Sequence, residues 1–144
     1  MINSFQWLSR GLELPALDFV KIQQWIIRVA GTHGRIVGDI AYIFCDDDNI
    51  LDVNRKFLGH DYFTDIITFD NTHGRMIAGD IFISLDTVRS NAEGLHEAYD
   101  RELLRVVIHG ILHLCGINDK GPGEREVMEQ NENRALALWT ATTD

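Results

Sequence analysis

Two histidines and an aspartate in the second half of the chain stand at spacings that suit one metal ion. His109 and His113 are four residues apart, so on a helix both imidazoles lie on the same face, one turn from each other. Gly116 is placed to end that helix in a left-handed conformation, which lets Asp119 approach the same point from the following loop. Two histidines and a carboxylate form an open site that leaves a position for water, as catalytic zinc requires. The sequence therefore predicts one Zn²⁺ ion bound by these three side chains.

The alternative for each histidine is a core residue satisfied by a single hydrogen bond. His109 and His113 are both flanked by isoleucine and leucine, so each would be a buried polar group in need of its own partner. Ligation of one metal satisfies both at once and is the favoured interpretation. Cys115 lies two residues past His113, about 200° around the helix, and is predicted to pack in the core, away from the metal.

The composition favours one globular domain over residues 1–144. The chain has 144 residues with 45% hydrophobic content, and it shows no linker, repeat or low-complexity tract. Its start lacks the features of a signal peptide, and its longest apolar run, 106–117, is too short to span a bilayer. Cys45 and Cys115 are expected to be reduced thiols. Together these features predict a cytoplasmic protein without a membrane partner.

The net charge is −9, which is the wrong sign for binding nucleic acid over the whole surface. A polyanionic substrate must therefore be held locally. The means would be a basic groove, the metal itself, or a larger assembly that presents the substrate.

The hydrophobic patterns predict the elements that must position these residues. Strands are expected at 2–7, on a sheet edge, and at 35–45, 66–69 and 76–84; helices are expected at 15–30, 46–57, 85–93, 97–115 and 123–139. The first helix would begin at a proline and present an apolar face of Leu17, Val20, Ile22, Trp25, Ile26 and Val29. The expected architecture is α+β: a small mixed sheet of about four strands covered by about five helices, with the metal site on one helix and its exit loop.

Three motifs in order resemble one known family. They are the segment 54–69, the Gly79-Asp80-Ile81 segment and the His-Gly-x-x-His-Leu-x-Gly motif at 109–116, followed by Met128-Glu129. This combination strongly resembles the YbeY family of bacterial rRNA maturation endoribonucleases. The resemblance implies a zinc-dependent, single-strand-specific endoribonuclease that acts in 16S rRNA 3′-end maturation and ribosome quality control. Its implied partners are an rRNA precursor and the small ribosomal subunit or its assembly factors, with no DNA substrate.

The chain departs from the family pattern at two positions. Asp119 stands where the family usually has a third histidine, which adds one negative charge and should make a bound metal a weaker Lewis acid. Leu58 stands where the family usually has an arginine thought to support activity. Leucine cannot bind a phosphate, so either cleavage is weaker or another cation has taken that role.

Arg105 is the first candidate for that role. It precedes His109 by four residues, so its guanidinium would lie one turn from the metal and could hold the scissile phosphate in a bidentate manner. The alternative is a solvated helix residue paired with Glu102. His60, beside Leu58, is the second candidate. Either would stabilise the negative charge that develops on phosphorus during attack by a metal-activated water.

Two further aspartates belong to the resembling motifs. Asp65 and Asp80 are expected first to have structural roles in turns beside strands. The functional alternative is that one of them accepts the second N–H of a ligand histidine. No residue is an obvious general base.

Three other functions remain open at this stage. A zincin-like protease would need a glutamate directly after the first histidine, where this chain has Gly110. A non-heme iron oxygenase also uses two histidines and a carboxylate, but such triads are commonly built on a β-barrel. A ribosome-assembly factor with a structural metal is favoured by the acidic charge and by Leu58.

Overall fold

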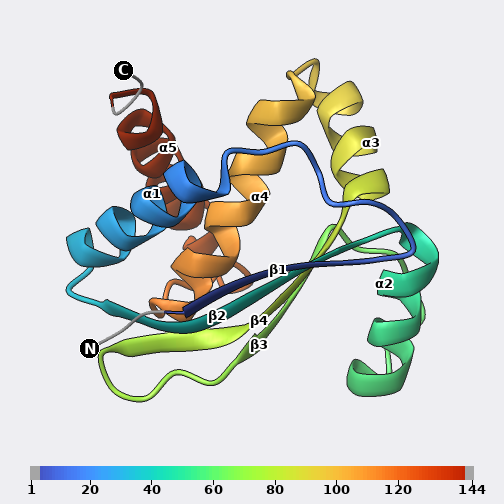
Figure 1. The fold of residues 1–144 in the computed structure, drawn as a ribbon, viewed down its shortest axis with the longest axis horizontal. Coiled ribbons are helices and arrows are strands. Elements are labelled where there is room, and N and C mark those ends of the chain that lie inside the picture. The colour runs from blue at the N-terminus through green and yellow to red at the C-terminus, as the bar shows by residue number, and fades with distance from the viewer. Residues whose placement is uncertain (1–3, 142–144) are drawn as a thin grey trace.

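A computed structural model of the chain describes residues 4–141. These residues form a four-stranded mixed sheet with helices packed on it (Figure 1). The elements in chain order are β1 (Ser4–Arg10), α1 (Phe19–Thr32), β2 (Ile36–Cys45), α2 (Asp47–Val53), a π-helical turn η1 (Asn54–Leu58), β3 (Ile66–Asp70), β4 (Met76–Ser84), α3 (Leu85–Leu95), α4 (Tyr99–Leu114) and α5 (Glu124–Ala141). The predicted α+β class and four-stranded mixed sheet are confirmed.

The strands lie in the order β1-β2-β4-β3. The first three of these are parallel neighbours, and β3 runs antiparallel to β4 at the far edge. Parallel neighbours need crossover connections, which run through α1 between β1 and β2 and through α2, η1 and β3 between β2 and β4. The first strand lies at an edge, as predicted; residues 2 and 3 of its predicted range lie outside the described residues.

The two faces of the sheet bury different helices because side chains alternate along each strand. From β4, Ile81 and Ile83 join the main core under α1, α4 and α5, whereas Phe82 packs on the opposite face with Ile50 and Val53 of α2. Gly110 allows α4 to approach the sheet closely, since a Cβ there would lie 3.0–3.2 Å from side-chain atoms of β3 and β4. The helix that carries both histidines is therefore seated directly on the sheet.

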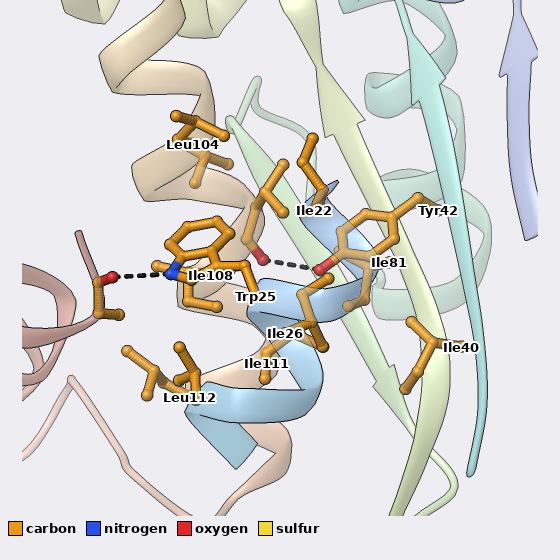
Figure 2. Close-up of a cluster of buried hydrophobic side chains, with 14 of the residues drawn as sticks. Ile22, Trp25, Ile26, Ile40, Tyr42, Ile81, Leu104, Ile108, Ile111 and Leu112 are labelled. Atoms are coloured by element: carbon orange, nitrogen blue, oxygen red, sulfur yellow. Dashed lines mark hydrogen bonds between the residues drawn. The ribbon is translucent and has the colours of Figure 1, made fainter. Parts of the chain in front are cut away.

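Two buried hydrogen bonds tie separate elements together in this core (Figure 2). The indole Nε1–H of Trp25 in α1 donates to the carbonyl of Ala135 in α5 at 2.7 Å. The hydroxyl of Tyr42 in β2 donates to the carbonyl of Val107 in α4 at 2.8 Å. Buried polar groups are costly unless paired, so these bonds fix where α4 and α5 sit relative to the sheet.

The predicted start of the first helix is wrong. Helix α1 begins at Phe19, not at Pro15, because the side chain of Asp18 caps it by accepting the backbone N–H of Lys21 at 3.1 Å. Val20 was also expected on the apolar face but is 65% exposed, because it lies about 200° around the helix from the buried Ile22. The other predicted helices are confirmed with small shifts at their ends. No helix within residues 4–141 is long and apolar enough to cross a membrane.

Candidate active site

A cleft of about 1070 Å³ runs beside α4 and is bounded by α3, α5 and the loop before β3. All five residues that the sequence predicts for the site line it: His60, Arg105, His109, His113 and Asp119. The structure thus brings together side chains that are spread over 60 positions of the sequence.

The loop that follows α4 places Asp119 beside His109, as the spacing predicts. Gly116 has φ +97°, in the left-handed region, and reverses the chain after Leu114. Asp119 then places Oδ2 3.2 Å from Nε2 of His109. Two ligand atoms of a tetrahedral zinc ion, each about 2.1 Å from the metal, are about 3.4 Å apart. The pair therefore has the separation that shared ligation requires.

His113 is the third predicted ligand. Its ring is nearly parallel to that of His109, at 9°, with ring centroids 6.3 Å apart. Its Nδ1 is buried and has no hydrogen-bond partner among the described residues. Within residues 4–141 no three histidine, cysteine or carboxylate side chains already converge as tightly as a metal site requires. His109 and Asp119 are thus close to each other, and His113 does not complete a three-ligand cluster with them in this structure.

Glu132 of α5 orients His109 and was not predicted from the sequence. Its Oε2 accepts the Nδ1–H of His109 at 2.7 Å, and its Oε1 accepts a hydrogen bond from Arg105 at 3.1 Å. Since a carboxylate can only accept, His109 must donate from Nδ1, which directs Nε2 toward Asp119. Helical spacing could have indicated this residue. Glu132 lies four residues after Met128 and three after Glu129, so it shares a helix face with these two residues, which also line the cleft.

The electrostatic environment of His109 favours its protonated form. Burial acts to lower the pKa of His109, but the hydrogen bond and charge of Glu132, together with the charge of Asp119, outweigh burial and raise it. Two carboxylates thus face one imidazole, and a divalent cation at Nε2 would be stabilised by the same charges.

Arg105 lies at the cleft wall with its guanidinium already engaged. Its Nε lies 3.5 Å from Oε1 of Glu102, and its Nη1 contacts both Glu132 and, at 3.4 Å, Oδ1 of Asn133. The ion pair with Glu102 is the alternative that the sequence left open, and it is present. Arg105 therefore neutralises buried carboxylates at the site, and a phosphate would have to compete with them.

The loop between η1 and β3 forms the opposite wall. Gly59, with φ +68°, ends the π-helical turn, and the residues that follow it line the cleft. His60 and Tyr62 are stacked there, with ring centroids 5.2 Å apart and an 18° angle between planes. The Tyr62 hydroxyl lies 3.0 Å from Nδ1 of His60. Leu58 also lines this wall.

The two motif aspartates lie in different places. Asp65 lines the cleft and accepts a hydrogen bond from Asn91 Nδ2 at 3.3 Å. Burial raises the pKa of Asp65, and the charge of His109 partly opposes that rise. Asp80 is exposed on β4 and is not among the residues that line the cleft. Asp65 thus lies in the same cleft as the two histidines, whereas Asp80 lies outside it.

The charge of the cleft opposes a polyanion. Six carboxylate side chains line it, against three cationic ones, Arg105, Lys120 and Arg125. Without a metal ion, its field repels phosphate. Binding of a nucleic acid here must therefore rely on a cation and on contacts that do not depend on charge.

Gly110 occupies the position at which a zincin carries its catalytic glutamate. The residue after His109 faces β3 and β4, where a Cβ would lie 3.0–3.2 Å from Ile81 and Ile66. A glutamate at this position would enter the sheet and could not reach a water in the cleft.

The chain resembles known proteins over nearly all of its length. Residues 12–140 match the family model described as Endoribonuclease YbeY. Endoribonuclease YbeY of Parabacteroides distasonis is 62% identical over 132 residues, covering 92% of this chain and 93% of the relative. That of Phocaeicola vulgatus is 64% identical over 130 residues, covering 90% and 94%. The solution structure of TM1509 from Thermotoga maritima matches with a TM-score of 0.65 and 25% identity over 95% of this chain and 92% of that one.

Proposed function

Since this chain belongs to the Endoribonuclease YbeY family and is an endoribonuclease, a hydrolase of RNA phosphodiester bonds, we propose that it cuts single-stranded RNA with one zinc ion. His109, His113 and Asp119 would hold that ion. The observation that carries the proposal is the 3.2 Å approach of His109 Nε2 to Asp119 Oδ2, with the other nitrogen of the same ring held by Glu132. A histidine that donates one ring N–H to a carboxylate and binds the metal through its other nitrogen is the usual arrangement around catalytic zinc.

The residues of the chain have separable roles in this proposal. When bound, zinc supplies a polarised phosphoryl oxygen and a more acidic water. Glu132 accepts the Nδ1–H of His109, which leaves Nε2 as the nitrogen that would bind the metal after losing its proton, and Arg105 balances the charge of Glu132. Asp119 adds a negative charge that a histidine would not, which lowers the acidifying power of the site. The buried, close-packed position of α4 keeps the first ligand rigid.

We propose the cytoplasm as the location and 16S rRNA 3′-end maturation and ribosome quality control as the process. The acidic character of the molecule supports a substrate presented by a larger particle. With a net charge of −9 and an acidic cleft, the chain has little attraction for free RNA. A precursor held on the small ribosomal subunit or by assembly factors would be brought to the cleft in spite of this repulsion.

The other function is an assembly factor whose metal only supports the fold. The core argues against it, because α4 is held by buried apolar side chains and by the Tyr42 hydrogen bond without any metal contribution. A structural zinc usually supplies folding energy that a small core lacks.

Metal analysis combined with cleavage assays tests the proposed function. We expect about one zinc per chain in the purified protein, cleavage of single-stranded RNA and little cleavage of a duplex of the same sequence. After chelation, circular dichroism should show the fold retained while cleavage is lost and returns with added zinc. Unfolding on chelation would favour the structural metal, and metal-independent cleavage would refute the zinc mechanism.

Arg105→Ala should lower cleavage of single-stranded RNA at least about tenfold, because a cation beside the developing charge on phosphorus is removed. The zinc content should stay unchanged, since Glu132 still reaches His109. Leu58→Arg should raise activity or rescue the loss, because it restores a cation to the opposite wall. Arg101→Ala, an exposed arginine one turn earlier on α4, is the matched control and should cut normally. A wild-type rate for Arg105→Ala would leave Arg105 with a structural role only.

A further inference from the structure

The wall of the cleft that faces α4 and α5 carries two aromatic rings a few residues after Leu58. His60 and Tyr62 both line the cleft and stack on each other, and Tyr62 is 53% exposed. Exposure of a large aromatic ring to water is unfavourable, and its π-face can bind another flat ring. The pair is continuous with the cleft that holds His109 and Asp119.

The loop that carries this pair is held in place from both sides. The buried side chain of Asn54 donates from Nδ2 to the carbonyl of Tyr62 at 2.9 Å. Arg55 and Asp61 form an ion pair across the base of the loop. The Tyr62 hydroxyl contacts Nδ1 of His60. Little ordering entropy is therefore left to be lost when a ligand stacks on the rings.

The charge balance of the cleft selects the kind of ligand. Carboxylates outnumber cations two to one around it, so phosphate contacts alone give weak binding. Stacking of a nucleobase on an aromatic ring is insensitive to this repulsion, tolerates any base, and requires a base that is not paired. Base stacking therefore suits the binding of single-stranded RNA in this cleft.

We propose that His60 and Tyr62 form a stacking platform for an unpaired nucleobase next to the scissile phosphate. This inference rests on the proposed function for the site and adds how the substrate is held. Stacking compensates for the arginine that Leu58 replaces. It also makes single-strand selectivity a property of this wall, because a base within a duplex cannot reach the rings.

Binding measurements with three variants test the platform. The probe is a fluorescein-labelled 2′-O-methyl oligoadenylate, titrated against the protein as purified by anisotropy and checked afterwards for integrity. An abasic oligonucleotide of equal length is the companion probe. Tyr62→Ala should weaken binding of the oligoadenylate roughly 5- to 100-fold while binding of the abasic probe is unchanged. Tyr62→Phe keeps the ring and should bind like the wild type.

Phe63→Ala is the matched control. Phe63 is 54% exposed, as much as Tyr62, but does not line the cleft, so its removal should leave both affinities unchanged.

Equal binding by Tyr62→Ala and wild type, or an equal loss with Phe63→Ala, overturns the platform. If the wild type cuts RNA but Tyr62→Ala is normal in binding, the platform fails and the nuclease proposal stands. If the wild type prefers the base-bearing probe through Tyr62 but cuts no RNA, the platform stands and the nuclease proposal fails. Absence of any binding preference for bases in the wild type refutes the platform.

Discussion

His113→Ala should lose its zinc and its RNA cleavage, while its free energy of unfolding stays at the value of the zinc-free wild type. Removal of a partner that only supports a ligand costs about 10- to 100-fold in metal affinity, so removal of a ligand should cost more than 100-fold. The fold should tolerate the change for two reasons. Alanine is the best helix former, and the substitution removes a buried ring nitrogen that has no partner among the described residues.

Elemental analysis, urea unfolding and a cleavage assay on single-stranded RNA measure these effects together. His73→Ala removes an exposed histidine in the β3–β4 hairpin, away from the cleft, and should leave all three readings at wild-type values. Stoichiometric zinc in His113→Ala would show that His113 is not a ligand. Loss of zinc with full cleavage would show that the metal has no part in the reaction.

Glu132→Ala should damage both the metal site and the stability. Glu132 is 6% exposed and accepts hydrogen bonds from His109 and Arg105, so its removal leaves the Nδ1–H of His109 without its acceptor and takes one carboxylate partner from Arg105. Removing one partner of a buried ion pair costs about 3–5 kcal/mol of unfolding free energy. The loss for Glu132→Ala should be about 2–3 kcal/mol, because Arg105 keeps its ion pair with Glu102. Zinc affinity should fall roughly 10- to 100-fold as the ring of His109 loses its orientation.

Two controls separate these effects. Glu129→Ala, an exposed residue that lines the cleft from the same helix, removes an equal charge and should change neither stability nor zinc affinity. Glu132→Gln keeps an acceptor oxygen for His109 and should retain more zinc than Glu132→Ala. If Glu132→Ala bound zinc with wild-type affinity, then Glu132 would serve the fold alone and His109 would be oriented by other means.

The secondary structure and the shared helix face of His109 and His113 could be predicted because they depend on local spacing. Period-two and period-3.6 patterns gave the strands and helices, and the interval from His109 to His113 fixed a shared helix face. The turn at Gly116 needs a positive φ, which only glycine adopts freely, so the return of Asp119 could also be expected.

The contacts that complete the site are not local. Glu132 meets His109 across 23 positions of the sequence, and Asn91 meets Asp65 across 26. No spacing rule relates such pairs, because the packing of α3 and α5 against α4 decides them. The start of α1 was missed for a different reason, since Pro15 and Asp18 are both good first-turn residues and the sequence alone gave no reason to prefer the aspartate.

The hydrogen bond from Trp25 to Ala135 joins residues 110 positions apart, so the docking of α5 closes nearly the whole described chain into one loop. Closing a loop of that length costs more chain entropy than forming any local helix or the β3–β4 hairpin, so we expect this hydrogen bond to form late in folding. Helix α4 carries both histidines by itself, but Glu132, the acceptor that orients His109, comes from α5. The orientation of His109 is therefore a property of the assembled tertiary structure and not of α4 alone.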